Sequence, residues 1–289
     1  MTERAAPRPR DLARRHGLTA DKRLGQHFLF DPAILDRIAA AAEPLENSRV
    51  LEIGPGPGGL TEALLRRNVE DLVAVERDPR CLAALAELVE AAKGRLRLVA
   101  ADARKVRPEE IAAGGRLIIV GNLPFNIATR LLLGWLRALD PVRHMVLMFQ
   151  KEVAQRLVAT SGSTHYGRLS VLTQRLCRVE RLFDLPPGAF TPPPRVHASL
   201  VRLTPRTDRP PTALLARLEQ VTRAAFGQRR KMLRSSLRAL ARDPRALCAA
   251  AGLEPSRRAE ELTIEEFEAL ALALTRARAH PDAAPPRMP

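Results

Sequence analysis

The chain has 289 residues and a formal net charge of +15, from 47 Lys and Arg against 32 Asp and Glu. This length suits one large domain with a smaller one, and no apolar run approaches the roughly 20 residues of a transmembrane helix. The basic excess favours a polyanionic partner, nucleic acid before membrane. A proteome rich in arginine would give the same total, so local clustering of charge is the better evidence.

Cysteine and histidine usage excludes two further classes. Cys81, Cys177 and Cys248 are odd in number and far apart, so we expect neither a disulfide framework nor a zinc site. The six histidines show no metal-ligand spacing, and no metal is predicted. The N-terminus lacks the apolar core of a secretory signal. A cytoplasmic location is therefore expected.

A glycine loop follows the first predicted strand. Residues 1–21 are polar and basic, and we expect a disordered tail. Asp31-Pro32 is a helix start, and residues 50–53 form a strand. Gly54, Gly56 and Gly59 come next, before a predicted helix over 60–67. Strand, glycine loop and helix together are typical of a nucleotide-like ligand, because glycines let the backbone approach it closely.

Carboxylates end the second and third predicted strands. Residues 72–75 lead to Glu76, about 20 residues after the glycine loop, and residues 96–100 lead to Asp102. A carboxylate in the first position can accept hydrogen bonds from both ribose hydroxyls of an adenosine. Asp102 can accept from an adenine amino group. A solvated charge at a strand end is the alternative for each.

The fourth strand, over 117–120, carries the most informative stretch. Gly121-Asn122-Leu123-Pro124-Phe125-Asn126 separates it from a predicted helix over 127–133. An amide, a proline and an aromatic ring thus lie at the carboxyl end of a core strand, the edge at which open α/β sheets bind ligands. Taken alone, the stretch also fits a proline turn with a packed Phe. Its place after three other strand-end motifs favours function.

The remaining pattern sets the domain organisation. Strand–helix alternation as far as a fifth strand at 144–149 predicts a parallel, doubly wound sheet. Two more strands, at 178–185 and 197–203, are followed by helical patterns alone. We expect an α/β domain over 22–204, a linker over 205–211, a helical domain over 212–278 and a tail over 279–289.

Together, the motifs resemble those of the class I S-adenosylmethionine-dependent methyltransferases. More narrowly, the chain is similar to the ribosomal RNA adenine N6-dimethyltransferases, and to the KsgA (RsmA) type that acts on the small subunit. Three further segments carry this resemblance, which runs from about Lys22 to about Leu274: 23–29, 190–196 and 225–231. It implies a Rossmann-like fold with a small C-terminal helical domain, and S-adenosylmethionine as cofactor.

The resemblance also implies roles for particular residues. Cofactor contacts are expected at His27, Leu29, Gly54, Gly56, Glu76, Asp102 and Asn122. The family often has Asn where this chain has His27, so a packed loop histidine is an equal alternative there. Catalytic roles are expected for Asn122, Leu123, Pro124, Phe125 and Phe190. Phe190 would be a second aromatic wall for the target base; a core Phe between two strands is its alternative.

The chemistry explains why these residue types are needed. Adenine N6 is a weak nucleophile because its lone pair is delocalised, so it must be aligned more than deprotonated. The Asn122 side-chain oxygen and a backbone carbonyl at Leu123 or Pro124 can accept its two N–H bonds. Phe125 can stack on a base that has left its helix, a contact worth roughly 1–3 kcal/mol.

The second predicted domain is basic. Arg229, Arg230, Lys231 and Arg234 are concentrated near one predicted helix start. A solvated face is the usual explanation of a charge run, but such a face would mix both signs. We expect these four residues to bind RNA phosphates, with structured RNA recognised by its shape.

The function that the resemblance implies is N6-dimethylation of two adjacent adenosines in the 3′-terminal hairpin of small-subunit (16S) ribosomal RNA, and we expect a monomer that acts on a pre-ribosomal 30S particle. Three alternatives stay open. They are a large-subunit methyltransferase of the macrolide-resistance type, a non-catalytic assembly or transcription factor on the same scaffold, and a dinucleotide oxidoreductase. The intact Glu76, Asp102 and Asn122 disfavour the second, and the Asn-Leu-Pro-Phe motif disfavours the third.

Overall fold

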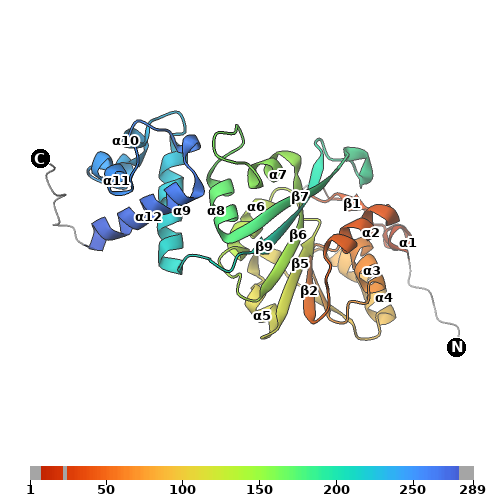
Figure 1. Cartoon of the computed structure of the whole chain (residues 1–289). Helices are drawn as coiled ribbons and strands as arrows, with labels where there is room; N and C mark the ends of the chain where they lie inside the picture. Colours follow the sequence, from red (N-terminus) through yellow and green to blue (C-terminus); the bar gives the residue numbers. More distant parts are fainter. Residues whose placement is uncertain (1–7, 22–24, 280–289) are drawn as a thin grey trace, which may run out of the picture. The chain divides into compact units, whose positions relative to one another are not determined.

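The computed structural model describes residues 8–21 and 25–279 (Figure 1). These residues form two compact units. The first contains residues up to Ala154 together with Glu180–Pro205, and the second contains Gln155–Val179 together with the residues from Arg206 onward. The expected division kept 22–204 in one piece. In the structure the chain instead enters the second unit twice.

A seven-stranded sheet dominates the first unit, in the order β4-β3-β2-β5-β6-β9-β7 (Figure 1). The pairs β4–β3, β3–β2, β2–β5 and β5–β6 are parallel, and β6–β9 is antiparallel. The doubly wound α/β fold predicted from the sequence is confirmed. Its strands are β2 (Ser48–Ile53), β3 (Leu72–Glu76), β4 (Leu96–Ala100), β5 (Arg116–Gly121), β6 (Val142–Gln150), β7 (Cys177–Leu185) and β9 (Ala198–Pro205).

One helix precedes the first strand of this sheet and the others follow its parallel strands, as crossover connections require. They are α2 (Pro32–Ala41), α3 (Gly59–Arg66), α4 (Pro79–Ala91), α5 (Pro108–Ala112), α6 (Ala128–Trp135) and α7 (Lys151–Leu157), with short 3-10 turns at Ala103–Lys105 and Pro187–Ala189. The Asp31 carboxylate accepts from the backbone N–H of Ala33 and Ile34, which confirms the predicted start of α2. Asp78 caps α4 in the same way.

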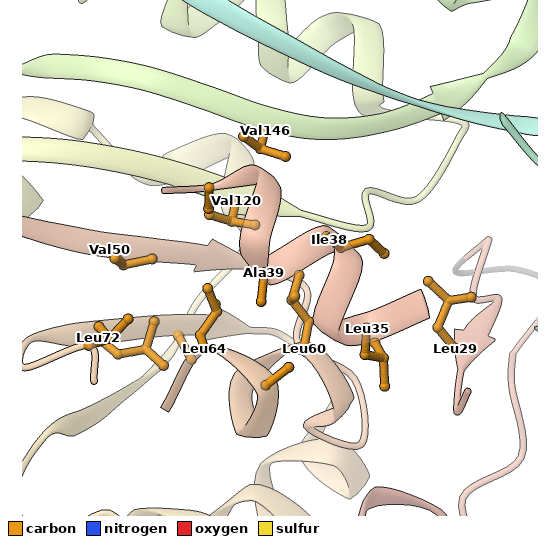
Figure 2. Close-up of a cluster of buried hydrophobic side chains, with 14 of the residues drawn as sticks. Leu29, Leu35, Ile38, Ala39, Val50, Leu60, Leu64, Leu72, Val120 and Val146 are labelled. Atoms are coloured by element: carbon orange, nitrogen blue, oxygen red, sulfur yellow. The ribbon is translucent and has the colours of Figure 1, made fainter. Parts of the chain in front are cut away.

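The central strands are buried on both faces, which is why they read as continuous apolar runs. Val50 and Val120 belong to a cluster that α2 and α3 cover, and Figure 2 shows Leu35, Ile38 and Leu64 in it. The alternate residues of these strands are fully buried as well: Leu51, Val73, Ile119 and Leu147 each have 0% exposure. Both faces of the sheet therefore pack against protein.

The expectation of a disordered tail over 1–21 is wrong for its described part. Residues 8–21 contain helix α1 (Pro9–Arg15), and its Leu12 is fully buried in the same core cluster. Arg15 and His16 also contact Glu87 of α4, at 2.6 and 2.9 Å. A single leucine among charged residues does not produce the apolar periodicity from which a helix is predicted, so the helix is evident only from its packing against the rest of the unit. Residues 1–7, 22–24 and 280–289 lie outside the described residues, and with them the predicted C-terminal tail beyond Ala279.

The second unit is helical. It contains α8 (Arg168–Leu176), α9 (Thr212–Gly227), α10 (Leu233–Ser236), α11 (Pro244–Ala250) and α12 (Ile264–Ala279), with 3-10 turns at Leu237–Ala239 and Ala259–Glu261. Residues 155–179 join this unit because α8 packs on α9 and α12. Arg175 of α8 forms an ion pair with Glu268 of α12 at 2.6 Å, and the Gly162 N–H donates to the Glu260 carbonyl at 2.7 Å. No helix in the described parts of the chain is long and apolar enough to cross a membrane.

Candidate active site

A cavity opens at the carboxyl ends of the parallel strands, where ligands bind in sheets of this class. It encloses about 1020 Å³ including open space at its mouth, on the scale of sites for small molecules. All the residues predicted to contact a cofactor line it, as do the four residues of the Asn-Leu-Pro-Phe stretch. The structure thus gathers into one cavity His27, Leu29, Gly54, Gly56, Glu76, Asp102, Asn122, Leu123, Pro124 and Phe125.

The glycine loop forms one wall of this cavity. Gly54 and Gly56 adopt φ angles of +66° and +55°, which residues with a Cβ rarely tolerate. A Cβ at Gly56 would lie 3.1 Å from a ring carbon of Phe28, tighter than ordinary packing allows. The bare backbone is therefore required both by the turn and by the close approach of Phe28.

Glu76 is held by the backbone around it. One carboxylate oxygen accepts from the N–H of Arg77 at 2.7 Å and of Asp78 at 2.9 Å, and the other accepts from Gly56 at 3.2 Å. Burial raises the pKa of Glu76, and these three donors oppose the rise. The Gly56 contact ties the second strand end to the glycine loop and leaves the Oε2 atom able to accept from a ligand.

Glu52 is a site residue that the sequence analysis did not single out. Its side chain lines the cavity and is 1% exposed. Oε2 accepts from the Thr61 hydroxyl at 2.7 Å, whereas Oε1 has no partner among the described residues. Burial, with a smaller contribution from the charge of Glu76, raises the pKa of Glu52 to about 8. Its position two residues before Gly54 in a buried strand was the available signal.

Glu52→Gln is expected to make the protein more stable at alkaline pH. With a folded pKa of about 8 and an ordinary value of 4.5, the folded wild type holds a proton that the unfolded chain releases between these values. Wild-type stability then falls with rising pH in this window by about 1.4 kcal/mol per unit from this group. The neutral amide removes that slope. Urea unfolding from pH 5 to 9 measures it, and equal slopes in both proteins would mean that Glu52 is ionised.

Asp102 lies just beyond the end of β4 and lines the cavity. Its carboxylate accepts from the Arg104 backbone N–H at 2.9 Å and from the Arg104 guanidinium at 2.6 Å, and Arg77 lies 3.8 Å away. The hydrogen bonds from Arg104 are the main reason that the pKa of Asp102 is well below its usual range. The group is therefore ionised and acts only as an acceptor at neutral pH.

Asn122 is oriented by the segment that contains His27. Its Nδ2 donates to the His27 carbonyl oxygen at 2.9 Å. Because a carbonyl oxygen only accepts, the amide nitrogen faces His27, and Oδ1 remains the atom that can accept from a ligand. The His27 ring Nδ1 contacts the Pro192 carbonyl at 2.8 Å, and the ring lies 5.8 Å from that of Phe125, centroid to centroid. His27 therefore lines the cavity and is anchored by packing at the same time.

The backbone of the same stretch distinguishes two candidate acceptors. The Pro124 carbonyl already accepts from the N–H groups of Ile127 and Ala128, at 3.0 and 3.1 Å, where α6 begins. The Leu123 side chain is 1% exposed and anchors the loop. The Leu123 carbonyl oxygen is therefore the one of the two that can accept a hydrogen bond from a ligand.

The two predicted aromatic walls have different positions. Phe125 is partly buried and lines the cavity. Phe190 is 3% exposed, belongs to the hydrophobic core, and does not line the cavity. It lies in β8 (Phe190–Thr191), which pairs with β1 (Phe28–Leu29) so that Leu29 faces Phe190. The structure corrects the expected wall at Phe190, because this pairing holds the ring in the core.

The predicted RNA-binding residues belong to the second unit, in the turn between α9 and α10 and on α10 itself, where the sequence predicted a helix start. Arg229 is engaged within that unit. It pairs with Glu260 at 2.8 Å and donates to the Thr164 carbonyl at 2.9 Å, so one of the four cations expected to bind phosphate is paired with an acid of its own chain. Arg230 and Lys231 are exposed, and Arg234 is half-buried.

No cluster of three or more metal-ligating side chains occurs in the part of the chain that the structure describes. The site therefore consists of a glycine loop, three carboxyl groups, an oriented amide and one aromatic face. Such a set can bind a nucleoside by its ribose and base, and can align an amino group against a reactive carbon.

Comparison with known proteins agrees with this geometry. The model of the family described as ribosomal RNA adenine dimethylase matches residues 17–276. A ribosomal RNA small subunit methyltransferase A from Rhodopseudomonas palustris (strain BisA53) is 52% identical over 276 residues, 94% of this chain and 96% of the relative.

Two solved structures are similar as well. A dimethyladenosine transferase from Plasmodium falciparum has a TM-score of 0.70 at 25% identity, covering 86% of this chain and 98% of that one. The 23S rRNA methyltransferase ErmE has a TM-score of 0.66 at 26% identity, covering 86% and 99%. Sequence, fold and site thus lead to one assignment: the chain belongs to the ribosomal RNA adenine dimethylase family.

Proposed function

We propose that this protein uses S-adenosylmethionine to dimethylate N6 of two adjacent adenosines in the 3′-terminal hairpin of small-subunit (16S) ribosomal RNA. The observation that carries the proposal is the Asn122 amide, held by the His27 carbonyl with its oxygen free, at the edge of a nucleoside-sized cavity. The 52% identity to a relative with a small-subunit name favours this target over the large subunit.

The residues present fit the cofactor. Gly54 and Gly56 offer bare backbone, Glu76 offers a carboxylate oxygen for ribose hydroxyls, and Asp102 offers an acceptor for the adenine amino group. The partnerless Oε1 of Glu52 is a further buried polar atom at the cavity. When bound, S-adenosylmethionine supplies an electrophilic methyl group. His27 and Leu29 would close the same cavity.

Alignment of the target base is the work of the Asn-Leu-Pro-Phe stretch. The Asn122 Oδ1 and the Leu123 carbonyl oxygen accept the two N–H bonds of N6, which directs its lone pair at the methyl carbon and stabilises positive charge as it develops. Pro124 fixes the local backbone through its restricted φ. Phe125 stacks on the base after it has left its helix.

The second unit supplies positive charge for the RNA. Arg230 and Lys231 are exposed, and Arg234 is half-buried beside them; we assign these three to phosphate contacts. Arg229 contributes by fixing the turn through Glu260. The substrate on this proposal is a pre-ribosomal 30S particle, and the enzyme acts as a cytoplasmic monomer.

The test is incubation of the purified protein with labelled S-adenosylmethionine and unmethylated small ribosomal subunits, followed by mapping of the modified bases. We expect label on N6 of two neighbouring adenosines near the 3′ end of the RNA, and none on large subunits. Methylation of the large subunit alone would overturn the proposed target. Absence of transfer to any RNA would overturn the reaction.

A further inference from the structure

A hollow in the second unit is lined by arginine. Arg234, Arg238, Arg242 and Arg245 surround it, with Ser235, Ala241, Asp243 and Pro244 between them. It lies over α10, the 3-10 turn that follows it, and the start of α11. Arg234 lies on α10 and Arg238 on the 3-10 turn, and both line the same hollow.

These arginines differ from others in the same unit. Arg175, Arg229 and Arg257 each form an ion pair with a glutamate, at 2.6, 2.8 and 2.5 Å. In the described residues, none of the four lining arginines donates a side-chain hydrogen bond or forms an ion pair, and three of them are exposed. The one acid at the hollow, Asp243, caps α11 by accepting from the backbone N–H of Arg245 and Ala246.

Four cations without an acidic partner around one hollow favour an anion from outside the chain. Like charges gathered around one space repel each other, and the fold leaves them uncompensated although glutamates pair with arginines nearby. The helical turns on either side of the bend are packed, since Leu233, Leu237, Leu247 and Cys248 are 5% exposed or less. Three of the four arginines are carried by these packed turns, and Arg242 lies in the bend between them.

We propose that this hollow, formed by Arg234, Arg238, Arg242 and Arg245 and here called the arginine groove, binds the phosphate backbone of the ribosomal RNA substrate. This proposal rests on the proposed function and adds Arg238, Arg242 and Arg245 to the residues predicted from the sequence. The guanidinium fork matches phosphate oxygens in a bidentate manner. The groove has no aromatic side chain in its lining, so it contacts backbone and does not stack on bases.

RNA is the partner that the observations favour among polyanions. The four cations lie within twelve consecutive residues, and a phosphate backbone offers charges at regular intervals to such a row. Because these contacts carry no base information, the groove sets the register and orientation of the RNA while Asn122 and Phe125 select the base. An acidic protein as the partner is an outcome that the test distinguishes.

The first experiment compares two triple variants of the full chain. The groove variant carries Arg238→Ala, Arg242→Ala and Arg245→Ala. The matched control carries Arg223→Ala, Arg276→Ala and Arg278→Ala, which removes the same charge from exposed arginines on α9 and α12. Binding to small-subunit ribosomal RNA made by transcription is measured across a salt series. The groove variant should lower the log–log salt slope by about 2–3, and the control by less than about 1.

A second measurement does not depend on charge. The three native cysteines are buried, so a cysteine introduced by Ala241→Cys at the groove can be labelled selectively with an iron chelate. We expect hydroxyl-radical cleavage of the bound RNA from this position, and none from Ala277→Cys on α12. A polyglutamate chain is the competitor that reports on acidic protein, and it should not displace the RNA.

The outcomes separate the groove from the proposed function. Equal salt slopes for the two triple variants, or no RNA cleavage from position 241, would overturn the groove even if the wild type methylates small subunits. If polyglutamate displaced the RNA when both were present at the same concentration of negative charge, the partner of the groove would be an acidic protein and not RNA. Loss of wild-type methylation with the slopes as expected would instead overturn the reaction and leave the groove in place.

Discussion

Asn122→Ala is expected to lower the rate of single-turnover methylation by roughly 10²–10³-fold, the usual cost of removing one hydrogen-bonding group that acts on the transition state. In the proposed mechanism the amide oxygen accepts from N6, since the amide nitrogen donates to the His27 carbonyl. Affinity for RNA should stay close to that of the wild type. Rapid-quench assays with saturating RNA and S-adenosylmethionine measure the rate, and a titration measures the affinity for RNA.

Asn126→Ala is the matched control for this variant. Asn126 is the second amide of the same stretch, but it is exposed and does not line the cavity. Its replacement should leave the rate within about threefold of the wild type. A near-normal rate for Asn122→Ala would remove the amide from the mechanism. Equal losses in both variants would indicate a general disturbance of the loop.

Glu76→Ala is expected to abolish measurable binding of S-adenosylmethionine. The carboxylate is the strong acceptor at the end of β3, and charge-assisted hydrogen bonds to ribose hydroxyls are lost with it. The N–H groups of Gly56, Arg77 and Asp78 also lose their acceptor, so the glycine loop loses its tie to β3. Calorimetric titration of the purified variant measures the loss, which should exceed 100-fold.

Two controls accompany the Glu76 experiment. Glu76→Gln keeps an oxygen that can accept from the backbone donors, so its circular dichroism spectrum should be that of a folded protein. Its affinity for S-adenosylmethionine should nevertheless be lower than that of the wild type by about tenfold or more. Glu90→Ala removes the same charge from an exposed position on α4 and should bind normally. Wild-type affinity in Glu76→Gln and Glu76→Ala alike would exclude Glu76 from the cofactor site.

Much of the fold followed from local sequence. The strands β2 to β6 were predicted because strands buried on both faces are continuous apolar runs of a few residues. The strand-end motifs then fell at one edge, since the carboxyl ends of parallel strands meet there. For the same reason, the sequence alone assigns Gly54, Glu76, Asp102 and Asn122 to one site.

The tertiary structure decided what local patterns leave open. Phe190 and Arg229 illustrate this: the same ring could line a site or fill a core, and the same cation could bind RNA or an acid of its own chain. Pairing of β8 with β1 placed the ring in the core, and Glu260, 31 residues away in sequence, took the cation.

The orientation of Asn122 has the same origin, because it depends on a carbonyl 95 residues earlier in the chain. The motifs, the alternation of strands and helices along the chain and the class of chemistry were determined by the sequence itself. Which polar atoms remain free for a ligand depended on contacts between distant segments. Such contacts produce no periodic pattern in the sequence. Each polar group acquires its final hydrogen-bond partners and its final burial only when the whole chain has packed.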